Sequence, residues 1–103
     1  MTKNESSLLL YFETQAVDRG GLLESARMNG DDFAIAHRWN AMGFVRFGRI
    51  ASRDVHAKNV ATHDHWCVLS NEAWRIAQIE RRARCERIMP TATKTQTLRY
   101  GVA

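Results

Sequence analysis

Hydrophobic residues recur at helical spacing near the start of the chain. Thr2 and Glu5 stand at the spacing of a capping box, and Leu8, Leu9 and Phe12 follow at intervals that place them on one side of a helix. The glycines at positions 20 and 21 permit the left-handed turn that ends many helices. We therefore expect a first helix over residues 3 to 17.

A second long helix is expected after a short apolar pair. Leu22 and Leu23 suit a short strand, and residues 25 to 29 suit a brief helix. Asn29 is a good N-cap for a helix over residues 30–42, which Gly43 ends. One side of this helix is apolar, through Phe33, Ile35, Ala36, Trp39 and Met42, and the other is open, through Ala34, His37, Arg38 and Ala41.

Two strands and a last helix are expected in the second half of the chain. Residues 44–50 and 65–69 have the aromatic and β-branched content of strands, which would pair as a hairpin across an exposed polar loop at 51–64. Ser70 can cap a last helix that Pro90 ends. The expected fold is mainly α with a small β hairpin. Its core is expected to contain Phe12, Phe33, Trp39, Phe47, Trp66, Leu69, Trp74 and Ile76.

This order of elements resembles that of the winged helix-turn-helix superfamily. The segment Trp39-Asn40-Ala41-Met42-Gly43-Phe44-Val45 is similar to the family's passage from recognition helix into first wing strand. The segment Val68-Leu69-Ser70-Asn71-Glu72-Ala73 is similar to the return from the wing in MarR-type regulators. The resemblance covers most of residues 5 to 88. It implies a winged helix domain over residues 1–90, which leaves 91–103 as a flexible polar tail.

Composition narrows the class of protein further. The chain has 103 residues, which suits one domain, and its 15 Lys and Arg against 11 Asp and Glu give a formal charge of +4 that mildly favours an anionic partner. Cys67 and Cys85 are too few for a disulfide framework. No apolar run approaches the roughly 20 residues that span a bilayer. We therefore expect a cytoplasmic protein with reduced thiols and no membrane association.

The resemblance implies a small transcriptional regulator that binds double-stranded DNA. The helix at 30–42 would read the major groove, and the wing at 46–62 would contact the backbone. His37 and Arg38 lie on the open face of the helix, and the wing carries a basic stretch with no acid between positions 46 and 53. The residues expected to contact DNA are His37, Arg38, Arg46, Arg49, Arg53 and Lys58. A homodimer is compatible with this function.

Two acidic residues favour an alternative function, in which the partner is a protein. Asp31 and Asp32 stand at the front of the helix that would approach DNA, where two carboxylates would be repelled by phosphates. These acids favour a winged-helix protein-interaction module, such as an adaptor or an inhibitor of a larger complex, which does not bind DNA. The basic stretch of the wing favours DNA.

Other kinds of chemistry have less support. His63, His65 and Cys67 alternate along a predicted strand and so share one face, but three residues of one strand rarely complete a zinc site. We expect no metal, no cofactor and no enzymatic activity, since no phosphate loop, nucleophile elbow or carboxylate pair is visible. In the last helix, Glu80 could pair with Arg84 and Arg82 with Glu86, and the helix is expected to be solvated or to form a dimer.

Overall fold

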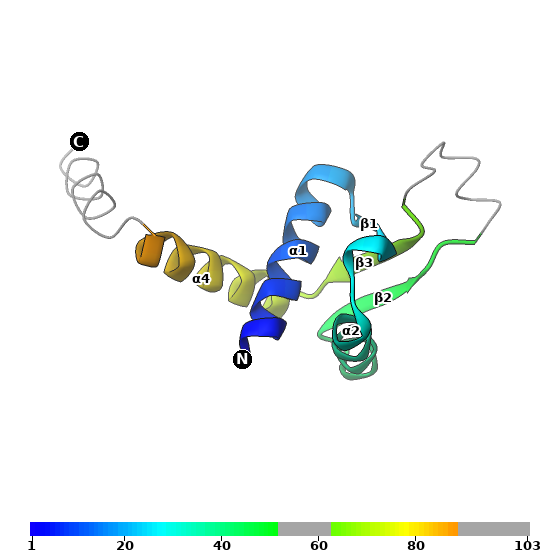
Figure 1. The fold of residues 1–103 in the computed structure, drawn as a ribbon, viewed down its shortest axis with the longest axis horizontal. Coiled ribbons are helices and arrows are strands. Elements are labelled where there is room, and N and C mark those ends of the chain that lie inside the picture. The colour runs from blue at the N-terminus through cyan, green and yellow to red at the C-terminus, as the bar shows by residue number, and fades with distance from the viewer. Residues whose placement is uncertain (52–62, 89–103) are drawn as a thin grey trace.

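The computed structural model describes residues 1–51 and 63–88. It contains three α-helices and a three-stranded antiparallel sheet, so the expected mainly helical fold with a small β component is confirmed (Figure 1). In chain order the elements are α1 (Lys3–Arg19), β1 (Leu22–Leu23), the 3-10 turn η1 (Ser25–Arg27), α2 (Gly30–Met42), β2 (Val45–Arg49), β3 (His65–Leu69) and α4 (Asn71–Ile88). No helix in this part of the chain is long and apolar enough to cross a bilayer.

Local side-chain caps explain where the helices begin. Thr2 and Glu5 form a complete capping box at the start of α1, and Asn29 and Asp32 form another at the start of α2. The Ser70 hydroxyl oxygen accepts a hydrogen bond of 3.1 Å from the backbone N–H of Ala73 in the first turn of α4. All three predicted helix starts are therefore confirmed.

The sheet has the order β1-β3-β2, so the strand that comes last in the sequence lies in the middle. Its pairing with β2 runs from Val45 opposite Leu69 to Arg49 opposite His65, which confirms the predicted hairpin. On its other edge, β1 pairs Leu23 with His65. The sequence predicted β1 as a short strand but not its place in the sheet.

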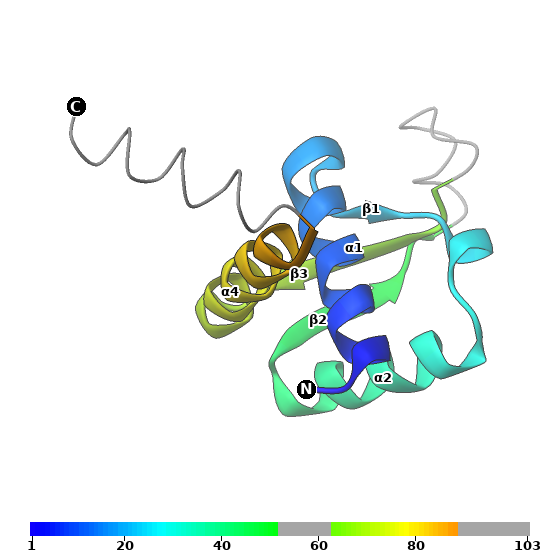
Figure 2. The ribbon, with the colours of Figure 1, turned by 60° about the vertical axis from the view of Figure 1, so that its left-hand side comes forward.

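The core lies between one face of the sheet and the helices α1 and α2, with α1 crossing the sheet (Figure 2). Phe12 is fully buried, and its ring stacks on that of Phe47 at 6.0 Å and meets the edge of Trp39 at 6.3 Å. Of the eight core residues predicted, four are buried, namely Phe12, Trp39, Phe47 and Leu69. Three others are partly buried against the core, namely Phe33, Trp74 and Ile76.

The eighth predicted core residue, Trp66, lies outside the core. Because successive side chains of a strand point to opposite faces, His65, Cys67 and Leu69 point inward and Trp66 points outward. Its indole is half-buried against Gly48, the residue opposite it on β2. Met42, which was expected on the apolar side of its helix, is exposed, as are Val17 of α1 and Cys85 of the last helix.

The last helix, α4, packs against α1 as far as Arg84 and extends away from the sheet (Figure 1). Arg81 binds α1 by donating to Glu13, Thr14 and the backbone carbonyl of Leu10. Within the described residues, the ion pairs of α4 are Glu72 with Arg75 and Glu13 with Arg81. Neither pair predicted from four-residue spacing is among them. Glu80 accepts from Ser6 of α1 and Arg84 donates to Ser7 of α1 instead.

Candidate nucleic-acid interface

The open face of α2 is the first part of the candidate site. Ile35, Ala36 and Trp39 anchor the helix in the core. The residues expected on its other side, Ala34, His37, Arg38 and Ala41, are all exposed. The helical periodicity therefore predicted correctly which side of α2 is available to a partner.

Arg38 is exposed but already has a partner. Its guanidinium donates to Glu5 of α1 across 2.6 Å, with the side chains 54% and 20% exposed, respectively. Hydrogen bonds from the backbone and side chain of Thr2 lower the pKa of Glu5, and the charge of Arg38 lowers it further. Exposed ion pairs contribute at most about 1 kcal/mol to stability, so this contact holds Arg38 in place without preventing exchange for another anion.

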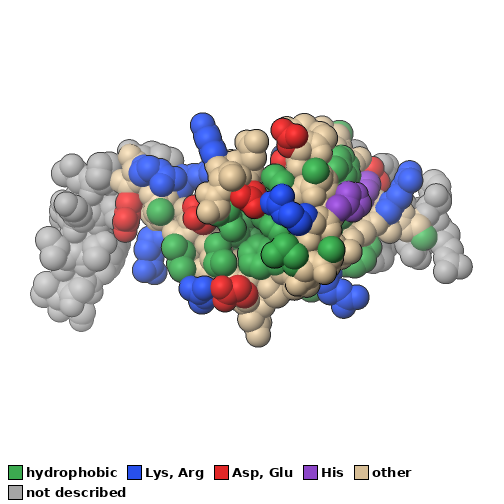
Figure 3. Space-filling view, turned by 90° about the horizontal axis from the view of Figure 1, so that it is seen from below, with side chains coloured by type: hydrophobic (Ala, Val, Ile, Leu, Met, Phe, Trp, Pro, Cys, Tyr) green, Lys and Arg blue, Asp and Glu red, His purple; other side chains and the backbone are tan. Residues whose placement is uncertain are grey.

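His37 borders a group of aromatic rings that the sequence did not predict. Its imidazole meets the ring of Phe47 edge-on at 5.5 Å, and Phe47 in turn stacks on His65 at 5.3 Å. Phe33 packs against both histidines. Figure 3 shows histidine side chains beside basic ones on this side of the molecule. One edge of His37 is thus fixed by packing while the rest of the side chain faces solvent.

Arg46 and Arg49 are both exposed on β2, but they lie on opposite faces of the sheet. Three positions along a strand reverse the side-chain direction. Arg49 lies on the face that α2 covers, the same face as Phe47, whereas Arg46 lies on the outer face, opposite Val68. The structure therefore places Arg49 on the same side as His37 and separates Arg46 from them.

Two of the predicted contact residues, Arg53 and Lys58, lie outside the described residues, as does most of the predicted wing. The predicted C-terminal tail at 91–103 lies outside them as well. Of the predicted DNA contacts, the structure describes His37, Arg38, Arg46 and Arg49, all exposed.

The base of the hairpin is fixed by Asp64, which the sequence analysis did not single out. Its carboxylate accepts hydrogen bonds from the backbone N–H of Ser25, at 2.9 Å, and from the Ser25 hydroxyl. Its backbone carbonyl accepts from Ile50, and its N–H donates to Leu23. Partial burial raises the pKa of Asp64, but hydrogen bonds from Ser25 and His65 outweigh it and hold the pKa at about 2.

The three residues considered for metal binding serve other purposes in the structure. Cys67 is buried beside the backbone carbonyl of Phe12, and burial raises the pKa of its thiol to about 12. His65 lies 3.1 Å from the Asp64 carboxylate, and His63 lies 3.5 Å from that of Glu24. Among the residues that the structure describes, no three His, Cys, Asp or Glu side chains are grouped so that they could hold a metal ion.

The two acids at the front of α2 differ in their surroundings. Asp32 accepts a hydrogen bond of 3.1 Å from the N–H of Asn29, so its carboxylate belongs to the helix cap. Asp31 is exposed. The helix therefore carries one cap carboxylate and one open carboxylate at the end where a nucleic-acid phosphate would approach.

Comparison with known proteins gave no match. No protein-family model, curated protein or solved structure matches this sequence or fold. What the site can do is therefore inferred from its geometry: a firmly anchored helix with an exposed face, a basic residue held in position on it, and a basic strand at its side.

Proposed function

We propose that this protein is a winged helix-turn-helix domain that binds double-stranded DNA and acts as a transcriptional regulator. The observation that carries the proposal is the open face of α2, where His37 and Arg38 are exposed and Arg49 of the hairpin lies on the same side of the sheet. The element order that the resemblance implies supports it, with η1 in the place of the second helix.

The dimensions of α2 suit a major groove. Its 13 residues extend about 20 Å, and a helix with its side chains is about 10 to 12 Å across, close to the width of the groove. Ala34 and Ala41 are small enough to let the helix approach closely. On binding, Arg38 would release the Glu5 carboxylate and contact a guanine edge or a phosphate instead. Arg49 would contact the DNA backbone beside it.

A titration of the purified chain with fluorescent duplexes at low salt tests the proposal. We expect affinity to fall steeply as salt rises, because bound arginines displace counterions from phosphates. Arg49→Ala should weaken binding to every sequence, whereas Arg38→Ala should mainly reduce discrimination between sequences. Arg87→Ala, at an exposed arginine in the last turn of α4, is the matched control and should leave binding unchanged. Absence of a complex with any duplex would refute the proposal.

Glu5→Gln provides a sharper version of this test. Glutamine keeps the capping box, since its side chain also accepts from the backbone N–H, but it carries no charge to hold Arg38. We expect this variant to bind DNA a few-fold more tightly, because Arg38 no longer has to leave a carboxylate. Unchanged or weaker binding would remove Arg38 from the proposed interface.

The second candidate function is a protein-interaction module, and Met42 favours it. This side chain is 68% exposed at the end of the same helix whose front carries the open carboxylate of Asp31. Figure 3 shows hydrophobic side chains gathered in the middle of the face that also carries the histidines. Asp31→Asn separates the candidates. It should strengthen binding if phosphates approach α2, and it should create no DNA binding if the partner is a protein.

A further inference from the structure

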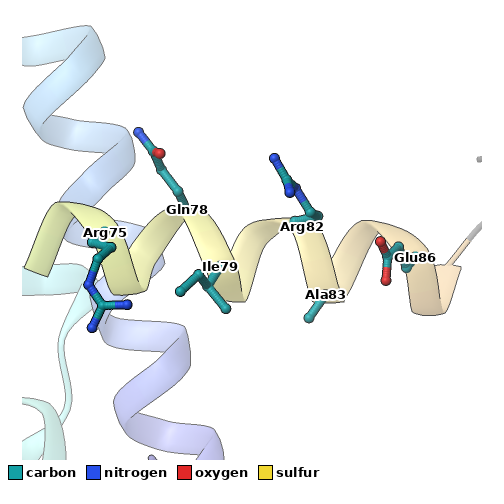
Figure 4. A pocket seen from close by; sticks show the side chains of 6 residues that line it. All are labelled: Arg75, Gln78, Ile79, Arg82, Ala83 and Glu86. Atoms are coloured by element: carbon teal, nitrogen blue, oxygen red, sulfur yellow. The ribbon is translucent and has the colours of Figure 1, made fainter. Parts of the chain in front are cut away.

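One face of α4 has no partner within the described residues. Its opposite face packs on α1, where Ala73 and Ala77 are fully buried. The free face forms a shallow groove lined by six side chains of this helix alone, namely Arg75, Gln78, Ile79, Arg82, Ala83 and Glu86 (Figure 4). At its centre, the large aliphatic side chain of Ile79 is 53% exposed.

The six positions are spaced symmetrically along the helix, so that 75 and 86, 78 and 83, and 79 and 82 are equally far from one midpoint. Their midpoint lies between Glu80 and Arg81. If a second α4 lies antiparallel across a two-fold axis at this midpoint, position 75 stands level with 86, 79 with 82, and 78 with 83. The two central pairs, 75 with 86 and 79 with 82, thereby face each other, and 78 and 83 flank them on opposite edges of the contact. A surface that maps onto itself in this way is what an interface between two identical chains requires.

The chemistry of these pairs is complementary. Arg75 would meet Glu86 of the second copy, once at each end of the contact. Ile79 would pack on the aliphatic stem of Arg82 of the second copy, and Ala83, at one edge of the contact, is small enough to let the helices approach. Arg75 also donates to Glu72 of its own helix, but both side chains are more than half exposed and that pair is weak. In a parallel arrangement Arg75 would instead meet Arg75.

We propose that this face of α4 is a homodimer contact in which two copies pack antiparallel through these six residues. The proposal goes beyond DNA binding and does not depend on it. The spacing of positions 75, 79, 82 and 86 alternates four and three residues, as along the seam of a coiled coil. Because stable interfaces generally bury about 1,200 to 2,000 Å² and this contact spans about three turns of helix, we expect micromolar self-association.

Sedimentation of the full chain at about 10 to 500 µM, with reciprocal charge variants, tests the contact. Arg75→Glu and Glu86→Arg should each weaken the dimer about tenfold, because each replaces two attractive pairs by two repulsive ones. The double variant should restore it. Arg87→Glu changes a charge of the same helix outside the face and should have little effect. A monomer at all concentrations, or a dimer indifferent to both single changes, would overturn the proposal.

Mixing the two single variants gives an independent test. In a mixed dimer, glutamate at 75 meets arginine at 86, and arginine at 75 meets glutamate at 86, so both pairs are attractive again. We expect the mixture to form heterodimers at concentrations where each variant alone is monomeric, as native mass spectrometry would detect. Circular dichroism establishes that each variant is folded. Two folded variants that stay monomeric when mixed would contradict the antiparallel register.

Discussion

The indole of Trp66 lies against the backbone of Gly48, its partner on the neighbouring strand, on the outer face of the sheet. A side chain at position 48 would place its Cβ 2.7 Å from Cζ2 of the ring, closer than such atoms approach. The glycine is therefore needed for the space it leaves open. It lets the ring cover part of the outer face of the sheet.

Gly48→Ala should force the ring of Trp66 to move. Because the indole is only half-buried and can shift, we expect a loss of about 1 to 2 kcal/mol in the free energy of unfolding. Urea titration measures it. The control is the same change in a Trp66→Ala background, where the alanine meets no ring and should cost much less. Equal costs in the two backgrounds would show that the ring contact is not the cause.

Two adjacent glycines after α1 should respond differently to alanine. Gly20 and Gly21 both have positive φ, at 64° and 91°. A Cβ at Gly20 meets nothing within 4 Å, whereas one at Gly21 would fall on the carbonyl oxygen of Cys67. Gly20→Ala should therefore cost about 1 to 2 kcal/mol, the usual price of a left-handed alanine. Gly21→Ala should cost at least twice as much, since backbone of β3 would have to move. Denaturant midpoints of the pair provide the comparison.

The carboxylate of Asp64 should make stability depend on acid pH. Its pKa in the fold is about 2, below its ordinary value of 3.8. The stabilisation is therefore present above about pH 4 and is lost as the pH falls toward 2. Because the side chain is 44% exposed, solvent screening limits the effect to about 1 kcal/mol. Asp64→Asn should be less stable than the natural chain near neutral pH, and the two should converge near pH 2 in urea titrations.

The two thiols should differ sharply in reactivity. Cys85 is exposed, whereas Cys67 is buried and burial raises its pKa to about 12. Since the thiolate is the reactive form, a thiol reagent near neutral pH should modify Cys85 quickly and Cys67 only when the fold opens. Mass spectrometry of the native chain should find one modified site, and the unfolded chain should have two. Rapid labelling of Cys67 in the native chain would contradict its burial.

The features that the sequence predicted well depend on neighbouring residues. Asn29 and Gly43 bound α2 because a cap and a left-handed glycine act within one helical turn. The exposed positions of His37 and Arg38 follow from the same helix geometry. Trp66 was wrongly predicted to be a core residue because tryptophan is large and apolar. The alternation of side chains from His65 to Leu69 would have placed it on the outer face of the sheet.

The features that the sequence did not predict join residues far apart in the chain. The contact of Arg38 with Glu5 and the hydrogen bonds of Asp64 to Ser25 have no local pattern, since each depends on how separate elements pack. The pairing of β1 with β3 likewise joins residues that are far apart in the sequence. The separation of Arg46 from Arg49 could have been found, because two residues three apart in a strand face opposite ways.

The middle position of β3 has a consequence for how the chain acquires its structure. Strand β1 pairs with β3 across a long stretch of sequence, and contacts of this kind form slowly because a large loop must close first. During synthesis, Leu9 and Phe12 of α1 have no sheet to pack against until residues 65–69 leave the ribosome. A nascent chain stopped before His65 would thus keep part of its apolar core open to aggregation, and folding would be completed only after β3 and α4 have emerged.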